Sequence, residues 1–175
     1  MAKLARILLV DDTPAEWLLA LSGIAEHDGK NETSVVRDKD EALDFLRARG
    51  AFRRRASGLP AVVVVGPNVS RPSALALLKE IRADVKLRRV PVVIVATAPD
   101  AEMVSRAYEQ GVNSLVLNHE DQNVRAERYV ELARFWAWAN EPPPGCLSQS
   151  RSQARPPLAL RFGFFTSRMM LPTRA

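Results

Sequence analysis

Residues 7–12 read ILLVDD, an unbroken aliphatic run that ends in two aspartates. A run with no polar position inside it is typical of a strand in a parallel sheet that is covered on both faces. Comparable β-branched or leucine-rich runs recur along the chain, and the expected strands are Arg6–Val10, Thr33–Val36, Ala61–Val65, Val90–Val95 and Ser114–Leu117. The sequence therefore predicts a five-stranded parallel sheet.

Segments with helical periodicity separate these strands. They are Pro14–His27, Asp40–Arg49, Ser73–Ala83, Asp100–Gln110 and Val124–Ala139. Asp38 or Asp40 can cap the second helix, and Gly50 and Gly111 stand where two helices should stop. Over residues 1–140 the alternation predicts an α/β domain with a doubly wound sheet, the flavodoxin-like strand order 2-1-3-4-5 and helices on both faces. In such a sheet a site lies at the carboxyl ends of strands 1, 3 and 4.

The composition fits a globular domain. Of the 175 residues, 47% are hydrophobic and 26% are charged, which suffices for a buried core in a soluble protein. No apolar run reaches the ~20 residues that a membrane-spanning helix needs. Carboxylates follow the apolar N-terminal stretch at once, which argues against a signal peptide. The one cysteine, Cys146, excludes an intrachain disulfide, and we expect a cytoplasmic protein.

The net charge of +5 comes from the C-terminal part of the chain, because residues 1–141 are formally neutral. Five arginines and no acid follow Pro142: Arg151, Arg155, Arg161, Arg168 and Arg174. We interpret residues 141–157 as a proline-rich linker and residues 158–175 as a basic and apolar tail that begins with a strand-like alternation. Three interpretations of the tail stay open: an arm that docks on a partner chain, a contact with membrane or nucleic acid, and an extension without a role. Because the arginines are dispersed, we expect no nucleic-acid binding.

The acidic pair Asp11 and Asp12 follows the first strand directly. Two adjacent carboxylates repel each other unless a cation or a base offsets their charge. One interpretation is a Mg²⁺ site, and the other is a solvated loop in which Asp12 caps the next helix.

Four segments together resemble response-regulator receiver domains of two-component systems, and in particular the single-domain regulators that partner bacterial and cyanobacterial phytochromes. They are ILLVDDTPAE at residues 7–16, VVRDKDEALDFLRARG at 35–50, LLKEIRADVKLRRVPVVIVAT at 77–97 and AYEQGVNSLV at 107–116. The resemblance extends in collinear order from Lys3 to Trp138. In active members it implies phosphoryl transfer from a histidine kinase to an aspartate that ends strand 3, with Mg²⁺, a threonine or serine after strand 4 and a lysine after strand 5 stabilising the charge.

The matching positions of this chain carry other residues. The acceptor aspartate is replaced by Gly66, the threonine or serine by Ala96, the lysine by Asn118 and the aromatic switch residue of strand 5 by Leu115. Thr97 is one position out of register unless a β-bulge intervenes. We therefore predict that the chain cannot be phosphorylated at the end of strand 3, and we assign it no catalytic residue and no enzymatic activity.

Some ligands of the family's metal site remain. Asp11 and Asp12, with the backbone carbonyl of Asn68 implied as a third ligand, predict at most weak Mg²⁺ binding, so no cofactor is required. We expect Gly66 to allow backbone angles that are closed to other residues. We interpret His119 as an exposed loop residue rather than as a metal ligand or phosphoacceptor.

Apolar residues on the first and last helices predict interfaces. Trp17 and Leu18 should form an apolar patch that docks on a kinase, as helix 1 does in the family. Tyr129, Leu132 and Trp136 share one face of the last helix and should pack on the sheet. Phe135 and Trp138 point away from that face and need a second cover, which we expect to be the partner in a homodimer, with the chain's own tail as the alternative. The basic stretch at residues 53–55 is expected to be a solvated loop with no role beyond solubility.

These features favour a pseudo-receiver that acts by binding a histidine kinase, such as a bacteriophytochrome, or another response regulator. Two alternatives remain. One is a phosphorelay protein that uses a non-standard acceptor such as Asp12, and the other is a structural module for dimerisation.

Overall fold

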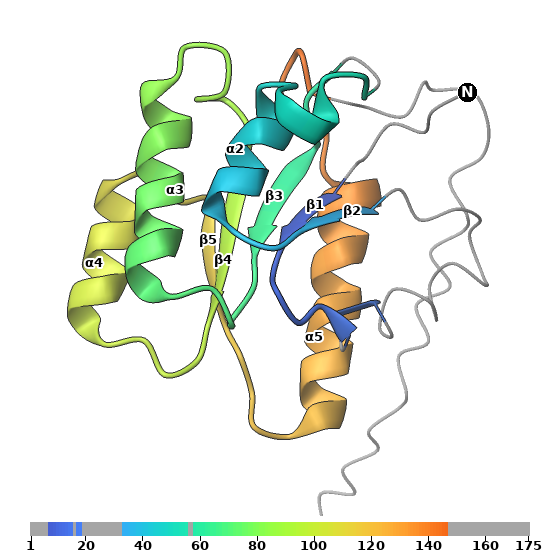
Figure 1. Ribbon diagram of the computed structural model, residues 1–175. Helices are drawn as coiled ribbons and strands as arrows, with labels where there is room; N and C mark the ends of the chain where they lie inside the picture. The colour runs from blue at the N-terminus through green and yellow to red at the C-terminus, as the bar shows by residue number, and fades with distance from the viewer. Residues whose placement is uncertain (1–6, 16, 19–32, 56–57, 147–175) are drawn as a thin grey trace, which may run out of the picture.

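The computed structural model describes residues 7–15, 17–18, 33–55 and 58–146. Five parallel strands form one sheet in the order β2-β1-β3-β4-β5 (Figure 1). The strands are β1 Ile7–Val10, β2 Thr33–Val36, β3 Val62–Val65, β4 Val92–Ala96 and β5 Ser114–Leu117. The predicted sheet and its order are confirmed, and the strand bounds differ from the expected ones by two residues at most.

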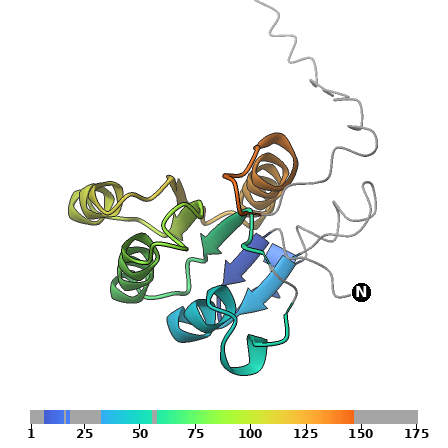
Figure 2. The same cartoon turned by 90° about the horizontal axis from the view of Figure 1, so that it is seen from above.

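Helices cover both faces of the sheet (Figure 2). Leu8 and Val10 of β1 pack in one hydrophobic cluster with α2, α3 and α4, whereas Ile7 and Leu9 pack in a second cluster with α5. The alternation follows from the strand period of two residues, which sends successive side chains to opposite faces. The helices are α2 Lys39–Leu46, α3 Arg71–Ala83, α4 Ala101–Glu109 and α5 Gln122–Arg134, with a short 3₁₀ turn η1 Gly50–Phe52 and a π-helical turn η2 Phe135–Ala139.

Polar side chains begin the helices. Asp38, rather than Asp40, caps α2 and accepts a hydrogen bond from the backbone N–H of Glu41. Asp100 caps α4 by accepting from Met103, and Asp121 caps α5 by accepting from Val124 and Asn123. Because these backbone N–H groups favour the charged carboxylate, they lower the pKa of Asp100 and of Asp121.

The last helix packs as its pattern predicts. Tyr129 and Leu132 are buried against the sheet and Trp136 is half-buried beside them, while Phe135 is 52% exposed. The side chain of Trp138, most of the predicted first helix and residues 147–175 lie outside the described residues. Within the described part of the chain, no helix combines the length and the apolar character needed to cross a bilayer.

The amino end of the sheet is held by Arg55. Its guanidinium donates to the backbone carbonyls of Gly58, at 2.6 Å, and of Leu46, at 3.2 Å, and lies 4.7 Å from the centre of the Phe45 ring. We expected residues 53–55 to form a solvated loop with no role beyond solubility, and this is wrong for Arg55. Its side chain is partly buried against α2 and links the end of that helix to the loop before β3. Nearby, the backbone of Cys146 pairs with that of Leu59 in an isolated parallel β-bridge. The first residues after η2 therefore return to the body of the domain.

Candidate functional site

The carboxyl end of β1 carries a buried carboxylate. Asp11 is 4% exposed, and its Oδ1 accepts hydrogen bonds from the backbone N–H of Thr13 at 2.9 Å and from the Asn68 side-chain amide at 3.0 Å. A carboxylate inside a protein is stable only where donors replace its lost water, and here the donors are uncharged. The neighbouring Asp12 is exposed and accepts a hydrogen bond from the Thr13 hydroxyl, at 3.1 Å.

Gly66, directly after β3, leaves the space that the Asp11 carboxylate fills. A β-carbon built at residue 66 would lie 1.8 Å from Asp11 Oδ2 and 2.6 Å from its Cγ, far inside contact distance. The φ angle of Gly66 is not among the positive values in the chain, so the expectation that glycine serves unusual backbone angles is wrong. Any other residue at position 66 would place a β-carbon where the Asp11 carboxylate lies, so one of the two groups would have to move.

The end of β4 faces a chain of neutral hydrogen bonds. Asn118 donates its backbone N–H to the Ala96 carbonyl and its side-chain amide to the Thr97 hydroxyl, at 3.1 Å, while its Oδ1 accepts from the Tyr129 hydroxyl at 3.3 Å. The pairing of Val93–Ala96 with β5 is continuous, so no bulge brings Thr97 into the place of Ala96. A neutral amide thus takes the position where the resemblance implies a cation.

Trp17 and α5 line the other side of this region. Trp17 is 4% exposed and packs against Tyr129 with the ring centres 4.9 Å apart and the ring planes tilted by 53°, so the prediction that Trp17 belongs to an exposed patch is wrong. The reason is that Trp17 faces the β1–α5 cluster, whereas Leu18, at 43% exposed, points outward. A cavity of about 430 Å³ separates Asp11 and Gly66 from Trp17, Asn118 and Tyr129.

Leu115 also differs from a switch residue in its surroundings. It is half-buried and packs against the hydrophobic cluster on the α4 face of the sheet. The aliphatic side chain of Leu115 cannot form a hydrogen bond. Ala96, at the end of β4, has no hydroxyl either, so no side-chain hydrogen bond can link these two positions.

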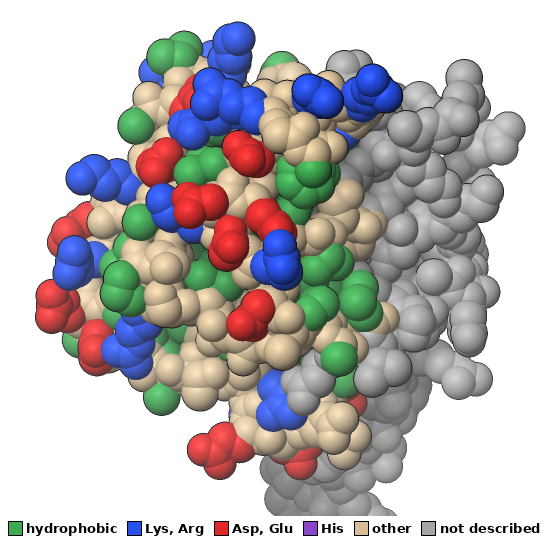
Figure 3. All heavy atoms as spheres, in the orientation of Figure 1, with side chains coloured by type: hydrophobic (Ala, Val, Ile, Leu, Met, Phe, Trp, Pro, Cys, Tyr) green, Lys and Arg blue, Asp and Glu red, His purple; other side chains and the backbone are tan. Residues whose placement is uncertain are grey.

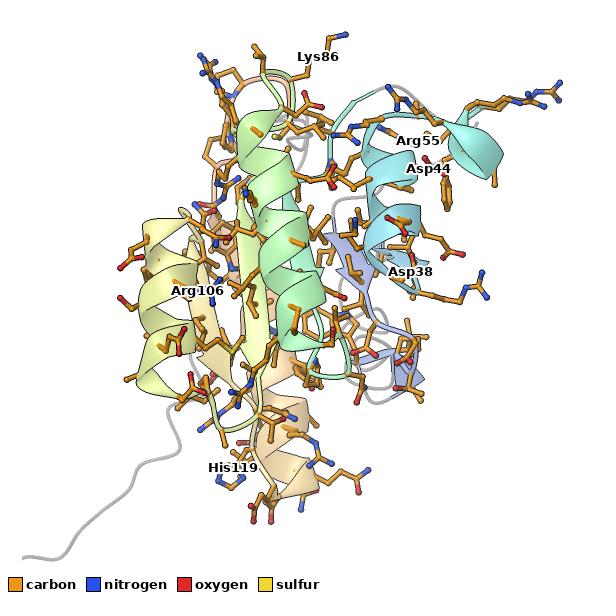
Figure 4. The ribbon with its side chains drawn as sticks, turned by 60° about the vertical axis from the view of Figure 1, so that its left-hand side comes forward. Asp38, Asp44, Arg55, Lys86, Arg106 and His119 are labelled. Carbon is orange, nitrogen blue, oxygen red and sulfur yellow. The ribbon has the colours of Figure 1, made fainter. Side chains whose placement is uncertain are left out.

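The candidate metal ligands of the site are few among the described residues. Within the described ranges there is no group of three or more His, Cys, Asp or Glu residues arranged for a metal. His119 is exposed, and its Nδ1 accepts the backbone N–H of Asp121 at 3.0 Å, so it serves the loop before α5 as expected. It lies near the start of α5, at the carboxyl end of the sheet (Figure 4). The remaining candidate ligands are Asp11, Asp12 and the carbonyl of Asn68.

Comparison with known proteins gives consistent relatives, although no family model matches the chain. The probable methanogenesis regulatory protein FilR2 of Methanothrix harundinacea is 29% identical over 142 residues, which cover 79% of this chain and 88% of FilR2. The response regulator Rcp1 of Synechocystis is 25% identical over 130 residues, which cover 74% of this chain and 87% of Rcp1.

Among solved structures, the bacteriophytochrome response regulator RtBRR is 36% identical, with 82% of this chain and 86% of RtBRR covered and a TM-score of 0.56. The chain is a response-regulator receiver domain. Receivers of lower identity have the same fold: phosphorylated RcpA, a cyanobacterial phytochrome response regulator, gives a TM-score of 0.70 at 24% identity over 81% of this chain and 99% of RcpA. The Mn²⁺-bound form of Rcp1 gives a TM-score of 0.69 at 24% identity, over 78% of this chain and 97% of the Rcp1 chain.

Two contributors to this receiver's site were not predicted. The amide side chain of Asn68 donates to Asp11, although only its backbone carbonyl had been considered, and Tyr129 donates to Asn118 from α5. A polar tip on an otherwise buried tyrosine is a signal for the second contact, because a buried hydroxyl requires a partner. The first contact has no sequence signal, since an exposed asparagine in a loop is ordinary.

Proposed function

We propose that the protein is a receiver that does not accept a phosphoryl group at the end of β3 and that acts by binding a histidine kinase or another response regulator. The observation that supports this most directly is the contact between Asp11 and Gly66. Residue 66 has no carboxylate, and the space beside it is filled by Asp11 Oδ2. An acyl phosphate requires a carboxylate oxygen open to the donor, and Asp11 is buried and hydrogen-bonded.

The loss of the cation beyond β5 supports the same proposal. Phosphoryl transfer depends on positive charge placed around the transferring oxygens. Asn118 is neutral and already engaged with Thr97 and Tyr129. Arg125, which also lines the cavity, donates to the carbonyls of His119 and Glu120, so its guanidinium is held at the start of α5.

Incubation with an autophosphorylated, radiolabelled phytochrome-type histidine kinase tests this proposal. We expect no label on the receiver and no covalent adduct with acetyl phosphate by mass spectrometry. The runner-up function is a phosphorelay through Asp12, which has an exposed carboxylate. Label that appears on the wild type and disappears in Asp12→Asn would replace the proposal with that relay.

Binding to the kinase is proposed to use the outer face of the first helix, where Leu18 is exposed beside the site. The receiver should compete with an active response regulator for the dimerisation domain of the kinase in a pull-down. We expect Leu18→Asp to weaken this competition and Ala101→Asp, an equal change of charge at an exposed position on α4, to leave it unchanged. Equal behaviour of the two variants would exclude the first helix as the docking surface.

A divalent metal is a minor part of the proposal. Rcp1 has a Mn²⁺-bound form, and this chain keeps Asp11 and Asp12 as carboxylates. However, Oδ1 of Asp11 already accepts hydrogen bonds from the Thr13 backbone N–H, the Thr13 hydroxyl and the Asn68 amide, and the described residues supply no cluster of three carboxylates here. We propose weak binding by Asp11, Asp12 and the carbonyl of Asn68. Titration of Mn²⁺ followed by electron paramagnetic resonance, with Asp11→Asn as the control, measures it.

Self-association is the third part of the proposal. Phe135 on η2, Leu117 on β5 and Tyr108 on α4 are each about half exposed, which supports a homodimer through this side of the domain. Residues 158–175 are proposed to add an arm to that dimer. Analytical ultracentrifugation of Phe135→Asp tests whether Phe135 contributes to the dimer. A dimer that persists in this variant would be stabilised by other residues. A receiver that dimerises but binds no kinase would be a structural module.

A further inference from the structure

A groove of about 680 Å³ lies at the amino end of the sheet, between the segment that follows α2 and the loop that joins α3 to β4. Four of its lining residues are aliphatic: Leu46, Leu59, Val85 and Leu87. Leu87 is 2% exposed and belongs to the core, whereas Val85 is 75% exposed at the rim. The groove therefore offers apolar contacts that are connected to the core and open to an incoming side chain.

Six exposed cations lie on the two segments that form this groove, and two of them, Arg49 and Lys86, line it. They come from the segment after α2 and from the α3–β4 loop: Arg49, Arg53, Arg54, Lys86, Arg88 and Arg89. None of these cations forms an ion pair with another described residue. Figure 3 shows lysine and arginine side chains gathered along this end of the molecule. Figure 4 places Lys86 and Arg55 there, at the end opposite His119.

The two acids nearest to the groove offset only part of this charge. Asp84 is the one acid among the described lining residues, and its carboxylate lies 3.2 Å from Nε of Arg47. The backbone N–H of Lys86, together with Arg47, lowers the pKa of Asp84. Asp44, on α2, lies against Gly50 of η1. The groove thus keeps a positive field at neutral pH, which attracts anionic partners.

The walls of the groove are held in place before a partner arrives. Arg55 ties residues 46 and 58 together, and Ala48 adopts a left-handed φ of 52° that turns the chain away from α2. On the other wall, Arg82 donates to the carbonyls of Arg88 and Val90. Ordered walls reduce the entropy that binding must cost.

We propose that this groove binds an acidic segment of a partner protein that carries an apolar side chain. The apolar side chain would enter beside Val85 and Leu87, and the carboxylates would face the surrounding cations. The chain's own tail is a poor occupant, because it has five arginines and no acid. Nucleic acid is also a poor occupant, because the described residues that line the groove include no aromatic side chain for bases to stack on, and phosphates would leave the aliphatic floor unused.

Fluorescence anisotropy with a labelled, glutamate-rich peptide that contains one central leucine tests the proposal on the full chain. We expect Lys86→Glu to weaken binding about fivefold or more, and Lys79→Glu, an equal change of charge at an exposed site on α3, to have a much smaller effect. Replacing the peptide's leucine with glycine, or Val85 with serine, should also weaken binding. Raising the salt concentration should weaken the electrostatic part.

Three results would overturn the proposal. The first is equal binding of the glutamate peptide and its glutamine analogue. The second is an equal loss from Lys79→Glu and Lys86→Glu. The third is tighter binding of single-stranded DNA, of phosphatidylserine vesicles or of a peptide with the sequence of residues 147–175, with the same dependence on Lys86, which would assign the groove to that ligand. Circular dichroism of each variant shows that the fold is retained.

Discussion

Strand β3 enters the sheet near Leu59 and leaves it at Gly66, and between these ends Val62–Val65 are fully buried. In the interior, any aliphatic side chain of suitable volume can fill the space between two layers of helices. At the two ends of β3, the structure depends on particular groups. The missing side chain of Gly66 leaves room for the Asp11 carboxylate, and the guanidinium of Arg55 holds the loop before β3 through the carbonyl of Gly58. The interior of the strand therefore tolerates exchange of one aliphatic residue for another, whereas the packing at each end depends on one particular residue.

The interior should show the largest effect on stability. Leu77 of α3 is fully buried in the cluster shared by α2, α3 and α4. We expect Leu77→Ala to lower the free energy of unfolding by about 2–5 kcal/mol, because it removes buried methyl groups and leaves a cavity. Urea denaturation measures the change. Val85→Ala, at an exposed position, is the matched control and should stay within about 0.5 kcal/mol of the wild type.

The carboxyl end should show the next largest effect. Gly66→Ala places a β-carbon 1.8 Å from Asp11 Oδ2, so one of the two groups must move. We expect a loss of about 1–3 kcal/mol in the free energy of unfolding, as for other overpacked sites. The double variant with Asp11→Ala should lose less than the sum of the two single changes, because the shared contact is removed. Strict additivity would contradict the steric explanation.

The amino end should show a smaller effect. Arg55→Ala removes the hydrogen bonds to the carbonyls of Leu46 and Gly58 and the contact with the Phe45 ring. We expect a loss of about 1–2 kcal/mol in the free energy of unfolding. Arg54→Ala, at the exposed neighbouring position, should change it little. Similar losses for both arginines would mean that the effect comes from net charge and not from the brace.

The sheet and its order could be predicted because the aliphatic runs leave few alternatives. The same holds for Tyr129 and Leu132, whose spacing places them on one face of α5. Burial of Trp17 and the bracing role of Arg55 could not be predicted, because each depends on a tertiary neighbour that no local pattern specifies. The role of Gly66 was missed for a related reason: its backbone is ordinary, and the requirement for glycine comes from Asp11.

The smallest effect concerns the exposed caps. The Met103 backbone N–H and Arg71 lower the pKa of Asp100. A lowered folded-state pKa gives stability that is present above the unfolded value of about 3.9 and is lost as pH falls through the folded value. Asp100→Asn should therefore be slightly less stable than the wild type at neutral pH, and the difference should vanish in acid. Denaturation curves across this pH range measure it, and a constant difference would contradict it.

The close approach of Asp11 to Gly66 has a consequence for the history of such a protein. An aspartate at residue 66 would bring a second carboxylate into the volume that the Asp11 carboxylate fills, and the cavity beside them is lined by the neutral Asn118. The substitution Gly66→Asp alone would then lower the stability of the fold before the new carboxylate could accept a phosphoryl group. In this fold, a chain with glycine at residue 66 would therefore gain a carboxylate there without strain only after a second mutation had freed the space that Asp11 fills.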